Sequence, residues 1–305
     1  MDNKIYYIGI DGGGSTSRLL AVDENQITLG RHTGDATNLT SLSREDVTSN
    51  IRRLLNEFNA KTNTRLENCK ALCIGTAGVD GTRNTALMES IFRDVGFKGK
   101  FKVVTDAAIA LMAKTKGEAG VCIISGTGSI GYAVDESGQT SRCGGWGAFI
   151  DDAGSGYKIG MEAIRYALMD FDGRSQSTIL TEKVANYFQL KCIDEVLKQV
   201  YSTPFDKAKI AKLAPLVRNA AEEGDEIALQ IENTAADDLA LLAKTLIYKN
   251  KLYNHMVVLC GGVLLNNKHI QNRFKQKVFE SYPQVIISPL DVEAEMGAIY
   301  LASVL

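Results

Sequence analysis

Two stretches of the chain share one pattern of apolar runs and glycine-rich turns. An apolar, strand-like run from Lys4 to Ile10 ends at Asp11 and is followed by three glycines. Two more strand-like runs follow, which predicts a three-strand meander with a glycine-rich first turn. The same order returns in the second half, and Ala-Val-Asp-Glu occurs in both stretches, so two duplicated domains are indicated. The predicted strands span 4–10, 17–23 and 27–32 in the first stretch, and 120–125 and 130–135 in the second.

Strand-like and helix-like segments alternate after each predicted meander. Within 43–62 apolar residues recur at helical spacing, and a strand-like run follows at 71–75. A meander followed by strand–helix alternation, seen twice, is the ribonuclease H-like topology of actin-like ATPases. The other predicted elements are helices near 84–95, at 107–114, at 267–281 and from Val292, a helical block at 155–251, and strands at 102–105, 256–260 and 285–287.

We therefore expect an α/β fold with two ribonuclease H-like (actin-like ATPase) domains facing a central cleft. A chain of 305 residues exceeds the usual size of a single hydrophobic core. The N-terminal domain is expected at 1–116, with the C-terminal helix at 292–305 packing back on it. The C-terminal domain is expected at 117–291 and carries the helical insertion.

Composition and charge exclude several classes of protein. Apolar residues make up 45% of the chain, and a formal charge of -2 gives no indication of a nucleic-acid partner or an anionic membrane. No basic leader with a cleavage site and no run long enough for a membrane helix is recognisable, so we expect a cytoplasmic protein. The cysteines form no C-x-x-C pair and are expected to be buried free thiols rather than a metal site.

The first glycine turn, residues 12–16, has the composition of a phosphate-binding loop. Glycines let backbone N–H groups approach phosphate oxygens, and a carboxylate at the end of a strand, here Asp11, can hold Mg²⁺. Arg18 adds a positive charge nearby. An ordinary hairpin turn explains the motif equally well, and no Walker A lysine follows. The candidate nucleotide-binding residues of this turn are Gly12, Gly13, Gly14, Ser15 and Thr16.

The second glycine turn, residues 125–129, is a further candidate for phosphate binding. It occupies the same place after its strand, and two facing loops are a stronger indication than one. A glycine pair after the apolar run 256–259 would leave bare backbone for an adenine or ribose, although such a pair is also typical of a plain strand-to-helix turn. The candidate nucleotide-binding residues of these two elements are Gly126, Thr127, Gly128, Gly261 and Gly262.

Asp106 lies where open α/β folds place reacting groups. It follows the predicted strand 102–105 directly and opens the next helix. As an N-cap it would stabilise that helix by about 1 kcal/mol. A helix N-terminus also keeps a carboxylate ionised, which is the state that a general base requires. The two roles are compatible, and Asp106 is the candidate catalytic residue.

The segment 142–157 combines features of a sugar-binding site. It holds Trp146, the only tryptophan of the chain, among three glycines, and continues into a loop with two aspartates. Bare backbone, an aromatic face and carboxylates that accept from hydroxyl groups suit a sugar. A structural turn with Trp146 as its plug is the alternative. The candidate substrate-binding residues are Gly145, Trp146, Asp152 and Ser155, together with Asn38 and Thr76 from the first half.

Taken in order, these elements resemble the BadF/BadG/BcrA/BcrD-type ATPases, and within them the N-acetylglucosamine kinases. The resemblance runs from Tyr7 to about Ala302 and is most specific at 105–108, 124–129 and 143–155. It implies ATP and Mg²⁺ as cofactors, a homodimer, and transfer of the γ-phosphate to the 6-hydroxyl of an amino sugar. N-acetylglucosamine is the first expectation, and N-acetylmuramic acid and glucosamine are left open.

The resemblance also implies roles for individual residues. Asp106 would be the base for the sugar 6-hydroxyl. The residues around the amino sugar would be Asn38, Gly145, Trp146 and Asp152. The residues that contact the phosphates would be Thr127 and Gly128 of the second glycine turn.

Two positions depart from the family pattern. Ala153 stands where many relatives carry glutamate, which removes a carboxylate near the sugar, and Ser15 stands where threonine is usual. The zinc motif of ROK-type sugar kinases is missing, which disfavours that neighbouring family.

Two rival functions remain. An ATP-driven activator of a dehydratase or reductase would need a Cys-rich loop that is not recognisable here, and an actin-like assembly or sensor protein would not explain Asp106 and Trp146 together.

Overall fold

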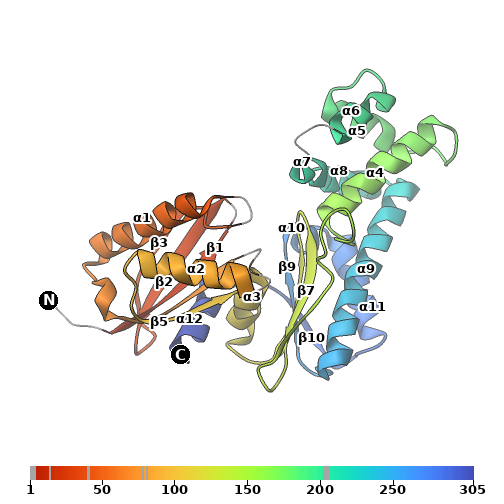
Figure 1. The fold of residues 1–305 in the computed structure, drawn as a ribbon. Coiled ribbons are helices and arrows are strands. Elements are labelled where there is room, and N and C mark those ends of the chain that lie inside the picture. Colours follow the sequence, from red (N-terminus) through yellow and green to blue (C-terminus); the bar gives the residue numbers. More distant parts are fainter. Residues whose placement is uncertain (1–4, 14, 40–41, 77–78, 80–81, 202–205) are drawn as a thin grey trace. The chain divides into compact units, whose positions relative to one another are not determined.

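The computed structural model describes residues 5–13, 15–39, 42–76, 79, 82–201 and 206–305, and the chain forms two compact units. The first unit contains Met1–Ala119 and Leu290–Leu305, and the second contains Gly120–Pro289. Each unit is built around one five-stranded sheet. Figure 1 shows the chain coloured along the sequence, with the blue C-terminal helix beside the red and orange elements of the first unit. The last helix of the chain therefore belongs to the unit in which the chain begins.

Five strands form the sheet of the first unit: β1 (Tyr6–Gly12), β2 (Thr16–Asp23), β3 (Thr28–Asp35), β4 (Cys69–Thr76) and β5 (Lys100–Val104). Their order is β3-β2-β1-β4-β5. The first three strands form an antiparallel meander, whereas β4 and β5 run parallel to β1. Gly12 pairs with Thr76, and Gly75 pairs with Val104. The carboxyl ends of β1, β4 and β5 consequently lie next to one another at one edge of the sheet.

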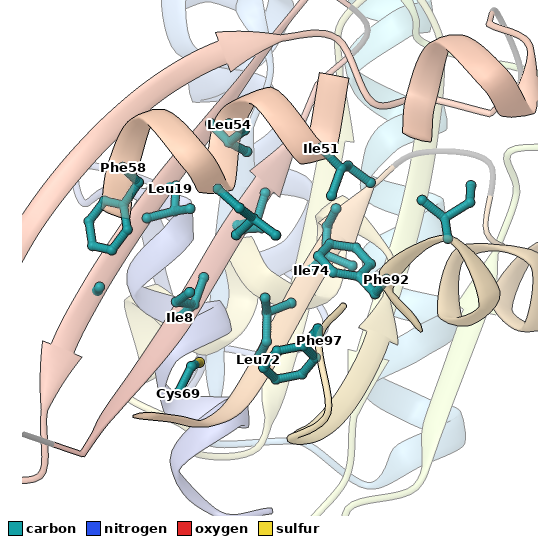
Figure 2. Close-up of a cluster of buried hydrophobic side chains, with 14 of the residues drawn as sticks. Ile8, Leu19, Ile51, Leu54, Phe58, Cys69, Leu72, Ile74, Phe92 and Phe97 are labelled. Carbon is teal, nitrogen blue, oxygen red and sulfur yellow. The ribbon is translucent and has the colours of Figure 1, made fainter. Parts of the chain in front are cut away.

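Helices cover both faces of this sheet. They are α1 (Arg44–Thr62), the short 3-10 helix η1 (Leu66–Asn68), α2 (Thr82–Asp94), α3 (Asp106–Thr115) and α12 (Ala294–Ser303). Because side chains alternate along a strand, β1 sends Ile8 into the core under α1 and α2, and Tyr7 into the core on the opposite face, with α3 and α12. Figure 2 shows the first of these cores, where Ile8 lies with Leu54 of α1 and Phe92 of α2.

Two glycines let α12 approach the sheet and α3 closely. A Cβ atom at Gly9 of β1 would lie 2.3 Å from the Glu295 carbonyl oxygen, and one at Gly297 would lie 1.8 Å from the Ile109 carbonyl oxygen. Any larger residue at either position would push the two backbones apart. Helix α12 therefore sits directly on β1 and beside α3, the helix that begins at Asp106.

The sheet of the second unit repeats the topology of the first. Its strands are β6 (Gly120–Ser125), β7 (Ser129–Val134), β8 (Thr140–Cys143), β9 (Met256–Cys260) and β10 (Ile286–Pro289). Their order is β10-β9-β6-β7-β8, with an antiparallel meander from β6 to β8 and with β9 and β10 parallel to β6. The helices of this unit are α4 (Gly156–Phe171), α5 (Leu180–Phe188), η2 (Ile193–Val196), α6 (Leu197–Val200), α7 (Lys207–Ala211), α8 (Ala214–Glu222), α9 (Glu226–Asn250), α10 (Gly262–Asn266) and α11 (Lys268–Phe279).

The fold class expected from the sequence is confirmed, since both sheets have the meander followed by parallel strands. Predicted and observed element boundaries differ by a few residues. Strand β4 begins at Cys69 rather than at 71, because it continues its pairing with β1 back to Tyr6. The predicted helical block at 155–251 divides into α4 to α9.

Most cysteines are buried free thiols, as predicted. Cys192 is exposed, contrary to the prediction, because it lies at the surface just before η2 rather than in a strand. Cys143, at the end of β8, is half-buried. In the part of the chain that the structure describes, no helix combines the length and apolar character that a membrane span requires. The buried thiols are those of Cys69, Cys73, Cys122 and Cys260.

Candidate active site

Three neighbouring strand ends of the first unit carry predicted site residues, and two of these residues are carboxylates. Strand β1 ends with Asp11 and Gly12, β4 ends with Thr76, and β5 leads into α3 at Asp106. The order β1-β4-β5 places these ends side by side. The charge of Asp106 raises the pKa of Asp11, so the two carboxylates interact electrostatically. The structure thus brings together residues that stand far apart in the sequence.

Asp11 is a partly buried carboxylate whose charge is poorly compensated. Its pKa is raised from the ordinary 3.8 to about 6, chiefly by burial, and the charges of Glu295 and Asp106 act in the same direction. The guanidinium of Arg18, with Nη2 3.2 Å from Asp11 Oδ2, opposes it. A divalent cation would compensate the remaining charge, so the residues present fit Mg²⁺.

The ligands of such an ion would come largely from outside the protein. Within the described ranges, no group of three or more His, Cys, Asp or Glu side chains could hold a metal ion. Mg²⁺ commonly takes one or two carboxylates and completes its shell with water and substrate phosphates. A single carboxylate at Asp11 is therefore sufficient for an ion that arrives with a nucleotide.

The first glycine turn is anchored by backbone hydrogen bonds. The Gly13 N–H donates to the Thr16 carbonyl oxygen at 3.0 Å, and the Thr37 N–H donates to the Gly13 carbonyl oxygen at 3.3 Å. Ser15 and Thr16 are exposed, so their polar groups can reach a ligand. Gly14, also predicted to bind nucleotide, lies outside the described residues.

Asn38 and Thr76, predicted to bind substrate, flank this turn. A Cβ atom at Gly12 would lie 2.6 Å from Thr37 Oγ1 and 3.1 Å from Thr76 Cβ. Ser17 Oγ lies 2.9 Å from the same Thr37 hydroxyl group. Asn38 is buried directly after Thr37, and Thr76 is buried at the end of β4. The structure therefore gathers these residues in one corner of the first unit.

Asp106 is the first residue of α3 and not its N-cap, which corrects one of the two roles considered for it. The N-cap is Thr105, whose Oγ1 accepts from the Ala108 N–H at 3.2 Å. Asp106 Oδ1 accepts from the Ala107 N–H at 2.9 Å. The Asp106 carboxylate thus lies in the first turn of α3, against the partial positive charge of the helix N-terminus, while Thr105 supplies the cap.

In the second unit, the second glycine turn is interlocked with the segment 152–157. Ser125 Oγ donates to the Gly154 carbonyl oxygen at 2.8 Å. The Gly156 N–H, at the start of α4, donates to the Gly126 carbonyl oxygen at 2.8 Å. Among the described residues, no atom lies within 4 Å of the place where a Cβ of Gly126 would be. The turn is therefore rigid on one side and open on the other, as a phosphate-binding loop requires.

Asp152 is buried against this turn. It is 4% exposed and has a φ of 56°, in the left-handed region that non-glycine residues seldom adopt. Its Oδ2 would lie 3.0 Å from a Cβ atom at Gly128, and Lys207 Nζ lies 3.7 Å from the same oxygen. Within the described part of the chain, Asp152 Oδ2 has no hydrogen-bond partner.

A cavity of about 700 Å³ opens beside the second glycine turn. A pocket of this size is typical for a small-molecule ligand such as a nucleoside. Gly261, with a φ of 85°, is the N-cap of α10. A Cβ atom there would lie 2.3 Å from the Ser125 carbonyl oxygen, so only glycine allows this close backbone approach. The glycine pair thus forms a strand-to-helix turn, and its second member, Gly262, also lines the cavity. The cavity is lined by Gly126, Thr127, Ala211, Pro215, Gly262 and Asn266, among others.

Trp146 is not the plug of a structural turn. Its side chain is 65% exposed, and the Arg142 guanidinium lies 4.2 Å from the centre of its ring. Gly145 adopts a φ of 72° beside it, which presents the indole outward. Ser155, predicted to bind substrate, is buried and caps α4 by accepting from the Lys158 N–H. Its hydroxyl group therefore has a structural partner already.

Comparisons with known proteins show the family to which the chain belongs. The family model described as BadF/BadG/BcrA/BcrD ATPase family matches residues 8–302. The chain belongs to this ATPase family. An N-acetylmuramic acid/N-acetylglucosamine kinase from Clostridium acetobutylicum is 36% identical over 300 residues, which cover 97% of this chain and 98% of the relative.

Two further proteins extend the comparison. An N-acetyl-D-glucosamine kinase from Dictyostelium discoideum is 31% identical over 313 residues, covering 98% of each chain. The crystal structure of a Chromobacterium violaceum protein described as an N-acetylglucosamine kinase matches with a TM-score of 0.77 at 23% identity, covering 98% of this chain and 99% of that one. At that identity the match supports the fold of this family member.

Several residues of this BadF/BadG/BcrA/BcrD ATPase were not predicted from its sequence. Thr37, the neighbour of Asn38, donates its N–H to the Gly13 carbonyl oxygen of the first glycine turn. The charge of Glu295, on α12, contributes to the raised pKa of Asp11. Lys207 faces Asp152 from α7. A buried glutamate in an otherwise apolar helix is a signal that could have indicated Glu295, whereas Lys207 stands in a lysine-rich exposed segment with no distinguishing pattern.

Proposed function

We propose that the protein is an ATP-dependent kinase that phosphorylates the 6-hydroxyl group of an N-acetylhexosamine. The observation that carries the proposal is the 36% identity, over 97% of this chain, to an N-acetylmuramic acid/N-acetylglucosamine kinase. The acidic strand ends of the first unit and the glycine-lined cavity of the second unit support it, because a sugar kinase needs a base and a nucleotide site. N-acetylglucosamine and N-acetylmuramic acid are the proposed acceptors.

In this proposal each glycine turn binds phosphate oxygens of ATP through its backbone N–H groups. The cavity beside Gly262 receives the nucleoside. Asp11 would hold Mg²⁺, which when bound would neutralise charge on the phosphoryl group that is transferred. Phosphoryl transfer needs little covalent help from the protein, so alignment and charge neutralisation supply most of the acceleration.

Asp106 acts as the general base. Its carboxylate accepts the proton of the sugar 6-hydroxyl as that oxygen attacks the γ-phosphate. The proposed sugar-binding residues Asn38, Gly145, Trp146 and Asp152 orient the acceptor. Closure around the substrates would exclude water and so limit hydrolysis of ATP.

A kinase assay with purified protein tests this function. ATP consumption is measured with N-acetylglucosamine, N-acetylmuramic acid, glucosamine and glucose, and without sugar. We expect turnover that depends on an N-acetylhexosamine and a loss of at least about a hundredfold in kcat for Asp106→Asn, which keeps the shape of the side chain but not its basicity. Sugar-independent ATP hydrolysis, or full activity in Asp106→Asn, would contradict the proposal and the role of Asp106, respectively.

A further inference from the structure

We propose that Lys207 is a positioning residue of the kinase site that acts through Asp152. The Lys207 ammonium compensates the buried charge of the Asp152 carboxylate, which remains able to accept a hydrogen bond from a hydroxyl or amide group of the acceptor sugar. The inference rests on the proposed function and extends it to a residue of α7 in the helical part of the second unit.

Asp152 has one buried carboxylate oxygen that no hydrogen bond satisfies. Its backbone lies in the left-handed region, which aspartate and asparagine can adopt, and its Oδ2 atom has no hydrogen-bond partner among the described residues. A buried charged oxygen without a hydrogen bond is strongly unfavourable. The neighbouring Ser155 N–H donates to the Asp152 carbonyl oxygen at 3.0 Å and helps to fix the backbone there. Because Oδ2 is buried, a neighbouring charge rather than a ligand donor has to compensate it.

Lys207 faces this oxygen from a fixed helix start. Asp206 caps α7 by accepting from the Ala208 and Lys209 N–H groups, so the position of the adjacent Lys207 backbone is set. Lys207 Nζ lies 3.7 Å from Asp152 Oδ2, beyond the range of a good hydrogen bond. The ammonium group therefore acts on the carboxylate as a charge. Because Oδ2 is itself buried, a sugar donor would have to meet the other oxygen of the Asp152 carboxylate.

A purely structural ion pair would have a different signature. Its loss would lower thermal stability and affect both substrates alike, because Asp152 also lies against the second glycine turn. A positioning role predicts instead that the acceptor sugar is bound less well while the nucleotide is bound as before. The separate Michaelis constants for the two substrates distinguish these cases.

The test uses the full chain and steady-state kinetics with N-acetylglucosamine and ATP. We expect Lys207→Met to raise the KM for the sugar about tenfold, with kcat and the KM for ATP within about twofold of the wild type. Lys207→Arg, which keeps the charge, should restore the sugar KM. The matched control is Lys209→Met on the same helix, since Lys209 Nζ bonds to Gln199 Oε1 rather than to the site. An unchanged sugar KM in Lys207→Met would overturn the proposal.

A double-mutant cycle with Asp152→Asn makes the test specific. Asparagine tolerates the left-handed backbone at this position, so the variant should remain folded. In the Asp152→Asn background, Lys207→Met should cause no further rise in the sugar KM, because the charge that Lys207 compensates is gone. Additive effects of the two substitutions would refute an action through Asp152. Absence of sugar phosphorylation by the wild type would overturn the proposed function itself, whereas wild-type turnover with an unchanged KM in Lys207→Met would overturn only this inference.

Discussion

Buried carboxylates in this protein differ in what compensates their charge. Glu295, on α12, pairs with Arg31 at 3.2 Å. Glu232, on α9, is 1% exposed and has a neutral partner, since Asn267 Nδ2 donates to Glu232 Oε1. Among the described residues, Glu232 Oε2 has no hydrogen-bond partner. Burial accordingly raises the pKa of Glu232 above its ordinary value.

Glu232→Gln should stabilise the protein at neutral and alkaline pH. The folded chain holds the Glu232 proton more tightly than the unfolded chain, so the free energy of unfolding falls as pH rises from the ordinary 4.5 through the raised pKa. Glutamine carries no charge and avoids this loss. Thermal unfolding should show a higher Tm for the variant above that pH window and a shrinking difference as the pH approaches 4.5 from above.

Glu136→Gln is the control for this prediction. The Glu136 side chain is 81% exposed, so removal of its charge should leave the pH dependence of unfolding almost unchanged. A Glu232→Gln protein whose Tm follows that of the wild type at every pH would show that Glu232 is not a buried ionised group.

At the scale of single elements, the sequence allowed us to predict those features that are set by residues close by along the chain. The strand that ends at Asp11 and the helix that follows Thr105 could be placed because apolar periodicity and polar turn residues are local signals. The outward position of Trp146 could not, because it depends on backbone φ values in the preceding glycines. The pairing of Lys207 with Asp152 also could not, since it arises from the packing of α7 beside a distant turn.

The start of α3 links helix stability to catalysis. Thr105→Ala removes the hydroxyl group that accepts from the Ala108 N–H, which should lower the free energy of unfolding by about 1 kcal/mol. The same change loosens the helix turn that carries Asp106, so we expect kcat to fall about three- to tenfold. Ser43→Ala is the matched control, because Ser43 caps α1 in the same way through the Asp46 N–H. Equal losses of kcat in both variants would attribute the effect to stability alone.

The turn into α10 depends on close backbone contact as well as on conformation. Gly261→Ala would place a Cβ against the Ser125 carbonyl oxygen and strain a φ of 85°. Gly224→Ala is the control, since Gly224 has a φ of 91° and no atom within 4 Å of a Cβ in the described structure. Both variants should lose about 1–2 kcal/mol from backbone strain. Gly261→Ala should lower the free energy of unfolding more than Gly224→Ala does, and it should also raise the KM for ATP. If the two variants were equally stable and the KM for ATP did not change, the contact between Gly261 and Ser125 would have no part in nucleotide binding.

At the scale of the whole molecule, the two units share one sheet topology but carry different kinds of candidate site residues. The first unit carries acidic groups at the ends of β1 and β5, and the second carries an open glycine turn and a cavity. Both sheets present their candidate residues at the carboxyl ends of parallel strands, where open α/β folds typically bind ligands. The two sheets therefore present equivalent edges that hold different residues.

The first unit is discontinuous in sequence, so it cannot complete its core until the end of the chain is present. Helix α12 contributes Ala298, Ile299 and Ala302 to the core on the Tyr7 face of the sheet. A chain that stops at Pro289 should therefore lose the cooperative unfolding of the first unit and retain that of the second, whose residues are contiguous. Far-UV circular dichroism should lose the part of its thermal transition that comes from the first unit and keep the part that comes from the helices of the second unit.

Full-length Gly297→Val is the companion to this truncation. Its Cβ would overlap the Ile109 carbonyl oxygen of α3, which should lift α12 from its place without removing any residue. We expect the same selective loss, since the apolar side chains of α12 would no longer cover the sheet. If the truncated chain kept the full circular dichroism transition, the core on that face would be stable without α12, and the first unit would be defined by Met1–Ala119 alone.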